Sequence, residues 1–182
     1  MSGAHVESHA EHNKGIALLI AVLALVLAFS ETLGKSAQTA ALDANIQASN
    51  LWSFFQAKTI RQTTLSTAAE QLAALAAGEA ANRQVEAWQK IVERYQSEPE
   101  TGEGRKELSA RAKQAEQRRE RAMAAYHHYE LASAAVQIGI VLASASIITA
   151  MPALAWIAGA LGVVGAALCV AGVWFPAALH VL

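Results

Sequence analysis

The distribution of charge along this chain constrains its fold more than any other feature of the sequence. No Asp, Glu, Lys or Arg follows Glu130, and none occurs between Ile16 and Phe29. The region between Phe29 and Glu130 carries 13 of the 14 Lys and Arg residues. Charged residues make up 16% of the chain and hydrophobic residues 54%, whereas soluble domains average about a quarter charged. We therefore expect a membrane protein whose apolar ends flank a polar central region.

Three apolar runs are long enough to cross a bilayer as helices. They cover residues 16–33, 131–148 and 153–175, and a hydrocarbon core of about 30 Å needs runs of this length. Met151-Pro152 predicts the turn between the last two runs, and residues 1–15 form a polar N-terminal tail. The first run has a short apolar core and is open to an alternative interpretation as a cleavable signal peptide. The two glutamates of HVESHAEHNK argue against a signal peptide.

The basic residues predict the orientation of these runs. Only Lys14 precedes the first run, and the other basic residues lie between Lys35 and Arg121. By the positive-inside rule, the central region is cytoplasmic and the N-terminus lies outside. Arg118, Arg119 and Arg121 come shortly before the second run, where they could also attract anionic lipid headgroups.

The central region, residues 35–130, shows helical periodicity and no strand pattern. Val85, Trp88, Val92 and Tyr95 are spaced by three and four residues, as in the apolar stripe of a coiled coil. The segment SEPETGEG, residues 97–104, contains one proline and two glycines, which predict a break.

We expect helices over about 36–77, about 83–97 and from 105 onward, the last continuing into the second apolar run. The expected fold is therefore an all-α membrane protein with three transmembrane helices. A long, coiled-coil-like cytoplasmic helical hairpin lies between the first and the second. A compact three-helix bundle is the alternative arrangement of that domain.

The segment LWSFFQAKTIRQ, residues 51–62, places aromatic side chains beside basic ones. Such a mixture is typical of a membrane interface, yet a straight helix carries Trp52 roughly 28 Å beyond the first apolar run. We therefore interpret the segment as a packing and assembly motif whose basic residues lie opposite the acidic break at 97–104. The residues assigned to assembly and packing are Trp52, Phe55, Gln56, Lys58, Arg61 and Trp88. A two-helix hairpin cannot bury these aromatic side chains alone, so we expect a homo-oligomer.

Other polar residues give weaker indications of function. Glu31 and Gln137 are the polar side chains nearest the interior of the apolar runs, and they could line an ion path or bond neighbouring helices. Spacing by four and three residues places three N-terminal histidines, His5, His9 and His12, on one helix face. Without a completing carboxylate or cysteine, a solvated tail is the better interpretation. We expect no catalytic residue, no metal site and no cofactor, and the near-neutral net charge gives no indication of nucleic-acid binding.

Two segments resemble a known family of bacterial membrane proteins, domain of unknown function 4337. Its central motif is similar to W-x-x-[FY]-Q-A-K-S-[IL]-[RK]-Q. The matching residues here are Trp52, Phe55, Gln56, Ala57, Lys58, Ile60, Arg61 and Gln62, with Thr59 in place of Ser. A second motif, L-Q-I-A-I-x-L-A-S, is matched by Gln137, Ile138, Ile140, Leu142, Ala143 and Ser144, with departures at Val136 and Gly139. The resemblance implies three spans and a bacterial inner-membrane location, and it implies no activity.

The sequence thus predicts a non-enzymatic, oligomeric inner-membrane protein. Its cytoplasmic helical domain would act as an assembly or partner-binding module. The expected partners are membrane lipid and a second copy of the chain, with another membrane protein as a further candidate. The alternative is an ion-conducting or transport oligomer whose pore is lined by the first or second transmembrane helix.

Overall fold

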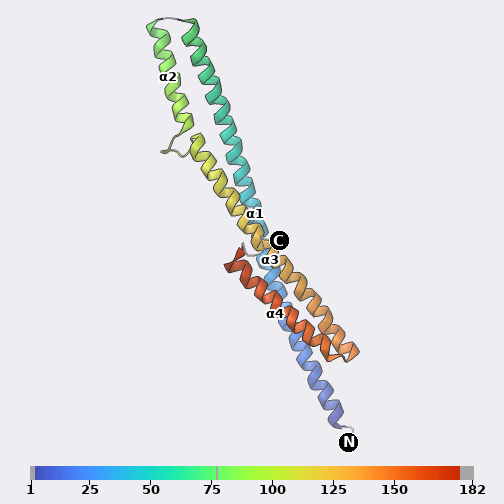
Figure 1. The fold of residues 1–182 in the computed structure, drawn as a ribbon. Helices are drawn as coiled ribbons and strands as arrows, with labels where there is room; N and C mark the ends of the chain where they lie inside the picture. Colours follow the sequence, from blue (N-terminus) through green and yellow to red (C-terminus); the bar gives the residue numbers. More distant parts are fainter. Residues whose placement is uncertain (1–2, 77, 177–182) are drawn as a thin grey trace. The chain divides into compact units, whose positions relative to one another are not determined.

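The computed structural model of the protein describes residues 3–76 and 78–176, with side chains from Lys14 onward. This part of the chain contains four helices and no strand: α1 (Gly3–Leu75), α2 (Glu79–Gln96), α3 (Arg105–Thr149) and α4 (Pro152–Trp174) (Figure 1). The predicted all-α class is therefore confirmed. The chain divides into two compact units. We call Leu42–Arg119 the polar unit, and Met1–Ala41 together with Glu120–Leu182 the apolar unit.

α1 is longer than the segments that the sequence predicted, whereas α3 runs from residue 105 into the second apolar run, as expected. The first apolar run and the helix expected after it belong to one helix, and residues 3–15, expected as a tail, are helical as well. Gly34 does not interrupt α1, since one glycine inside a helix costs only about 1 kcal/mol. It is buried, and a Cβ added there would make an ordinary contact, at 3.5 Å, with Cβ of Tyr129 on α3.

Three of the helices are long and apolar enough to span a membrane, as the sequence predicted. They are α1, α3 and α4, whose most apolar windows have mean hydropathies of 2.5, 2.0 and 2.2. No more than 28% of any of these windows is buried within the protein. Large apolar side chains therefore point away from the rest of the protein, as Trp156, Val163 and Trp174 do with exposures of 81%, 70% and 73%.

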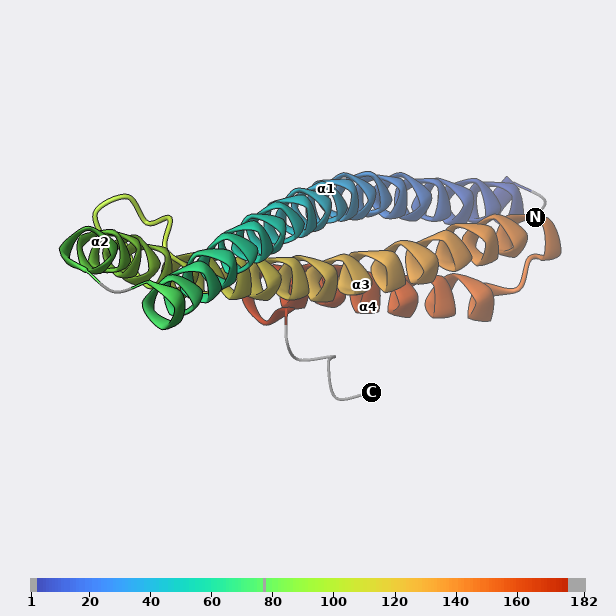
Figure 2. The ribbon, with the colours of Figure 1, turned by 90° about the horizontal axis from the view of Figure 1, so that it is seen from above.

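α4 packs inside the apolar unit through its smallest residues. Its buried residues are Ala158, Gly162, Gly165 and Gly172, and Figure 2 shows α4 beside α3 in this unit. A large side chain lies over each glycine: Leu23 over Gly162, Val136 over Gly165, and Tyr129 over Gly172. Small residues let helices approach closely where lipid gives no hydrophobic driving force.

The turn between α3 and α4 is closed by local hydrogen bonds. Ala150 has a φ of 55°, a left-handed conformation, and Pro152 begins α4. The hydroxyl of Ser146 donates to the carbonyl of Met151 at 2.9 Å. Proline fits the first turn of a helix because its missing N–H would have no partner there.

The polar unit combines α2 with the adjoining parts of α1 and α3. In Figure 1, α2 runs beside the C-terminal part of α1. The predicted stripe Val85, Trp88, Val92 and Tyr95 is half-buried, and α2 has no fully buried residue. Most of the best-buried side chains of this unit lie where α1 meets α3. They include Ala44 and Ala48 on α1 and Leu108, Ala112 and Ala115 on α3, whereas buried Lys58 lies against Tyr95 of α2 and the segment 97–104.

Candidate functional site

The motif that carries the family resemblance lies on α1 inside the polar unit. Trp52, Phe55, Lys58 and Gln62 are spaced by three, three and four residues, so they share one face of the helix. Each of them is buried or half-buried, whereas Gln56 and Arg61 are exposed. The motif therefore divides into an inward group, which makes the contacts described below, and an outward group.

Lys58 is the central residue of the inward group. Only 6% of it is exposed, and its ammonium lies 5.4 Å from the ring centre of Phe54 and 5.1 Å from that of Tyr95. Its Nζ is also 4.0 Å from a carboxylate oxygen of Glu98 and 3.8 Å from one of Glu103. Lys58 thus joins α1 to α2 and to the acidic break, the neighbourhood that the sequence predicted for it.

Trp52 and Phe55 form the part of the inward group that faces α3. The rings meet edge to face, with centroids 5.4 Å apart and an interplanar angle of 82°. The indole Nε1 of Trp52 donates to Oε1 of Glu116 at 2.8 Å. A charge-assisted bond of this kind fixes the ring orientation as well as adding energy.

Arg105, the first residue of α3, completes the cluster. Its guanidinium stacks over the ring of Phe55 at 4.9 Å and donates through Nη1 to the side-chain oxygens of Gln62 and Gln96. Gln62 also donates to the carbonyl of Val92 at 3.4 Å. The planar guanidinium can lie over a ring while its N–H groups donate in a fixed planar geometry, which a lysine ammonium does not offer. We name Trp52, Phe55, Lys58, Gln62, Glu98 and Arg105 the junction cluster.

The break at residues 97–104 is held against the start of α3 by Glu107. Its carboxylate accepts from the hydroxyl of Ser97 at 2.6 Å and from the backbone N–H of Glu98 at 3.1 Å. The Ser97 hydrogen bond is the main reason that the pKa of Glu107 is lowered. The hydrogen bond from Arg94 is the main reason that the pKa of Glu98 is lowered. Gly104 lies so close to this chain that an added Cβ would be 2.7 Å from Cα of Ser97.

The other residues singled out from the sequence lie outside the junction cluster. Trp88 is half-buried on α2. Arg118 donates to Gln47 at 3.1 Å and Arg119 to Asn45 at 3.4 Å, so both side chains contact α1 within the polar unit. Arg121 is exposed in the apolar unit, and the side chains of His5, His9 and His12 lie outside those described.

Glu31 and Gln137 lie together in the apolar unit. Nε2 of Gln137 is 3.5 Å from Oε1 of Glu31. Both line a groove of about 520 Å³ between α1 and α3. Next to this pair, the hydroxyls of Ser30 and Ser133 are hydrogen-bonded at 2.7 Å.

The junction cluster has the chemistry of a structural connection. Lys58 is already paired with carboxylates and aromatic rings, and Arg105 lies over Phe55 and donates to two glutamines. Among the described residues no three metal-binding side chains come together. Sequence reasoning missed Arg105 and Glu116 because both sit on α3 and are brought to α1 only by the packing. For Gln62, the match to the family motif was the one feature of the sequence that pointed to a role in this cluster.

Comparison with known families agrees with the resemblance in the sequence. The model of the family described as domain of unknown function (DUF4337) matches residues 12–175. No curated protein and no solved structure matches the chain. Since the match covers most of its length, the chain belongs to this family.

Proposed function

For this member of the family, we propose a non-enzymatic role as an oligomeric membrane protein whose polar unit is an assembly module. The observation that carries the proposal is an uncharged stripe on the outward side of α1. We call it the outer stripe; it consists of Leu42, Ile46, Ser49, Ser53, Gln56, Ile60, Thr63 and Thr67. Its members alternate steps of four and three residues, the spacing of a coiled-coil seam, and all of them are exposed.

The composition of the outer stripe is unusual for a face that meets only water. A surface helix normally carries charged residues opposite its buried side, and the outer stripe has none. Leu42, Ile46 and Ile60 are 58%, 57% and 66% exposed. Exposed apolar side chains on a stripe without charges support its use as an interaction surface.

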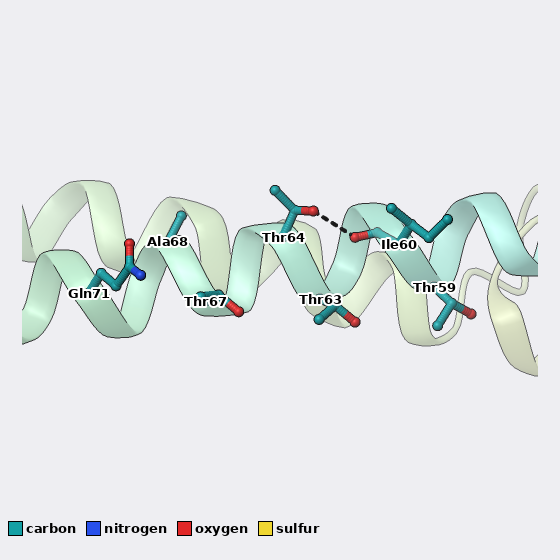
Figure 3. A pocket seen from close by; sticks show the side chains of 7 residues that line it. All are labelled: Thr59, Ile60, Thr63, Thr64, Thr67, Ala68 and Gln71. Carbon is teal, nitrogen blue, oxygen red and sulfur yellow. Dashed lines mark hydrogen bonds between the residues drawn. The ribbon is translucent and has the colours of Figure 1, made fainter.

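Thr59 and Thr64 flank the outer stripe, and their hydroxyls are occupied by hydrogen bonds within α1. This face of α1 is therefore more apolar than its composition indicates. The hydroxyls of Thr59 and Thr64 donate to the carbonyls of Phe55 and Ile60 at 2.8 and 2.9 Å. These hydroxyls are satisfied within α1 itself. Figure 3 shows a shallow hollow along α1, formed around Ile60, Thr63 and Thr67, where a side chain from another helix would fit.

The structure changes the reason for expecting an oligomer. Trp52, Phe55 and Trp88 are half-buried by their own chain, so they do not need a second copy to cover them. Small residues at the spacing of Ala158, Gly162 and Ala166 can also favour association of helices, but Ala158 and Gly162 are already buried inside the apolar unit. The outer stripe is therefore the surface that supports the proposal.

We place the protein in the bacterial inner membrane, with α1, α3 and α4 as spans, the N-terminus outside and the polar unit in the cytoplasm. Copies inserted with the same orientation can pair only in parallel. In a parallel pair, each residue of the outer stripe meets its own copy. A further membrane protein could use the same stripe as a partner.

Cysteine crosslinking tests this arrangement directly. In a Cys169→Ser background, Ser53→Cys at the centre of the outer stripe should form a disulfide-linked dimer in membranes under mild oxidation. Lys90→Cys, exposed on α2, is the control and should remain monomeric. If both variants crosslink equally, or neither does, the outer stripe is not the seam.

Charge insertion provides a second test of the same surface. Ile46→Glu with Ile60→Glu should lower the mass measured by light scattering in detergent, because like charges would face each other across a parallel seam. Ile91→Glu, at an exposed isoleucine of α2, is the matched control and should leave the mass unchanged. A wild-type protein that is monomeric in detergent and does not crosslink in membranes would refute the proposal.

The alternative role in ion conduction rests on the groove that holds Glu31 and Gln137. Further along the same helices the core cluster of the described residues is apolar and includes Leu23 and Ala143, which does not favour a polar path through one copy. If the protein in liposomes carries an ion flux that Gln137→Leu or Glu31→Ala changes, the alternative holds and the assembly proposal is incomplete.

A further inference from the structure

We propose that the groove between α1 and α3 binds the headgroup of one zwitterionic phospholipid with a primary ammonium, of the phosphatidylethanolamine type. The inference rests on the proposed membrane insertion and goes beyond the assembly role. Five lining residues come from α1 and six from α3, all within the apolar unit.

The groove has a closed floor and polar walls. Buried Ser30 is hydrogen-bonded to Ser133, and buried Gly34 lies against Tyr129, so the two helices meet closely beneath it. Longer polar side chains stand on either side of this contact: Glu31, Lys35 and Gln38 on α1, and Tyr126, Glu130 and Gln137 on α3.

The position of the groove fits a headgroup. Glu31 follows the uncharged run of α1, and Glu130 directly precedes the uncharged run of α3. The groove thus lies where the apolar segments of both helices end. On α3, the face that carries Glu130, Ala134 and Gln137 continues at helical spacing to Val141, which is 66% exposed and apolar. A headgroup in the groove would leave its acyl chains along this apolar surface.

The charges of the groove select among headgroups. Glu31 and Glu130 are carboxylates, and Lys35 is the one Lys or Arg among the lining residues. A primary ammonium can donate hydrogen bonds to the carboxylate of Glu130, while Lys35 can donate to the phosphate, which joins the ammonium to the acyl chains. A quaternary choline has no N–H to donate, and an anionic glycerol headgroup offers no cation to the carboxylates.

Native mass spectrometry of the detergent-purified chain tests the inference on the wild-type protein. Titration with phosphatidylethanolamine, phosphatidylcholine and phosphatidylglycerol of equal acyl chains should reveal one preferred lipid per chain. The first should bind about tenfold more tightly than the second, because bonds to charged groups are lost with choline. Equal affinity for the three lipids would overturn the inference.

A double variant assigns the preference to the groove. Glu31→Gln with Glu130→Gln should weaken phosphatidylethanolamine binding by about tenfold and leave phosphatidylcholine binding unchanged. Glu70→Gln, an exposed carboxylate elsewhere on α1, is the matched control and should leave both affinities as they are. A preference that survives in the double variant would overturn the assignment.

Two further experiments identify the source of the ligand and test the proposed membrane insertion separately. Soluble phosphoethanolamine should not displace the lipid at equal concentration, and displacement would mean that the groove binds a free metabolite instead. Release of the protein from membranes by alkaline carbonate would refute the insertion itself. A retained protein without lipid preference would refute only the groove.

Discussion

Lys58 combines deep burial with contacts to three segments of the polar unit. Lys58→Met keeps most of the volume and removes the ammonium, leaving Glu98 and Glu103 without their shared cation. Because these carboxylates are partly solvated, we expect a loss of about 1–3 kcal/mol, below the cost of breaking a fully buried pair. Thermal unfolding in detergent, followed by circular dichroism, measures it as a fall of several degrees.

Arg61 is the matched control for Lys58, since it belongs to the same motif and is exposed. Arg61→Met should change the stability by no more than about 0.5 kcal/mol, as is usual for exposed positions. Equal losses in both variants would show that the burial of Lys58 does not matter for folding.

Glu107 makes the stability of the polar unit depend on pH in the acidic range. Its pKa is lowered in the folded protein, mainly by the hydrogen bond from Ser97, so its carboxylate stabilises the fold. This contribution is complete above the ordinary glutamate pKa of about 4.3 and is lost as the pH falls through the lower folded value. The melting temperature of wild-type protein should therefore fall more steeply below about pH 4.5 than that of Glu107→Gln.

The control for this pH dependence is Glu86→Gln, at an exposed carboxylate of α2. Its melting temperature should follow the wild-type curve between neutral and acidic pH. The assignment to Glu107 is wrong if Glu86→Gln flattens the curve as much as Glu107→Gln does.

At the scale of elements, α4 depends on glycine at some positions and tolerates larger residues at others. A Cβ at Gly165 would lie 3.2 Å from the carbonyl oxygen of Ala132 and closer still to Val136, whereas one at Gly159 would meet nothing within 4 Å. Gly165→Leu should therefore destabilise the apolar unit by about 1–3 kcal/mol through overpacking. Gly159→Leu also replaces a glycine, which weakens a helix, but its side chain meets no clash. The stability of this variant should therefore equal or exceed that of the wild type.

The measurement for these glycine variants is thermal unfolding in detergent, monitored through tryptophan fluorescence, to which Trp156 and Trp174 of α4 contribute. The two substitutions add the same side chain to the same helix, so their difference isolates the contact with α3. If Gly165→Leu melts at or above the temperature of Gly159→Leu, α4 does not pack on α3 as the structure has it.

The elements also show what the sequence could and could not predict. Long apolar runs and regular spacing identify helices, because both are local properties of the chain. The packing of Gly34 against Tyr129 was not predictable, since Tyr129 belongs to a distant part of α3. Counting residues along two antiparallel helices placed Lys58 near Glu98. The stacking of Arg105 on Phe55 depends on rotational register, which counting alone does not provide.

At the scale of the whole molecule, the family could be recognised from local motifs, whereas the proposed interaction surface could not. The inward motif residues attract attention because they are aromatic and charged, yet their own chain already covers much of them. The outer stripe is made of ordinary residues such as Ser53 and Thr63. It becomes visible only when the structure shows which side of α1 is left uncovered.

The proposed orientation leads to the last prediction. Basic residues are concentrated between Lys35 and Arg121, and the positive-inside rule retains such a region in the cytoplasm. In a Cys169→Ser background, Ser8→Cys should react with an impermeant maleimide on intact spheroplasts, and Glu79→Cys should react only after lysis. Lysed membranes, in which both variants should react, control for accessibility. Labelling of Glu79→Cys but not Ser8→Cys on intact cells would invert the topology, so the polar unit and its outer stripe would face the periplasm.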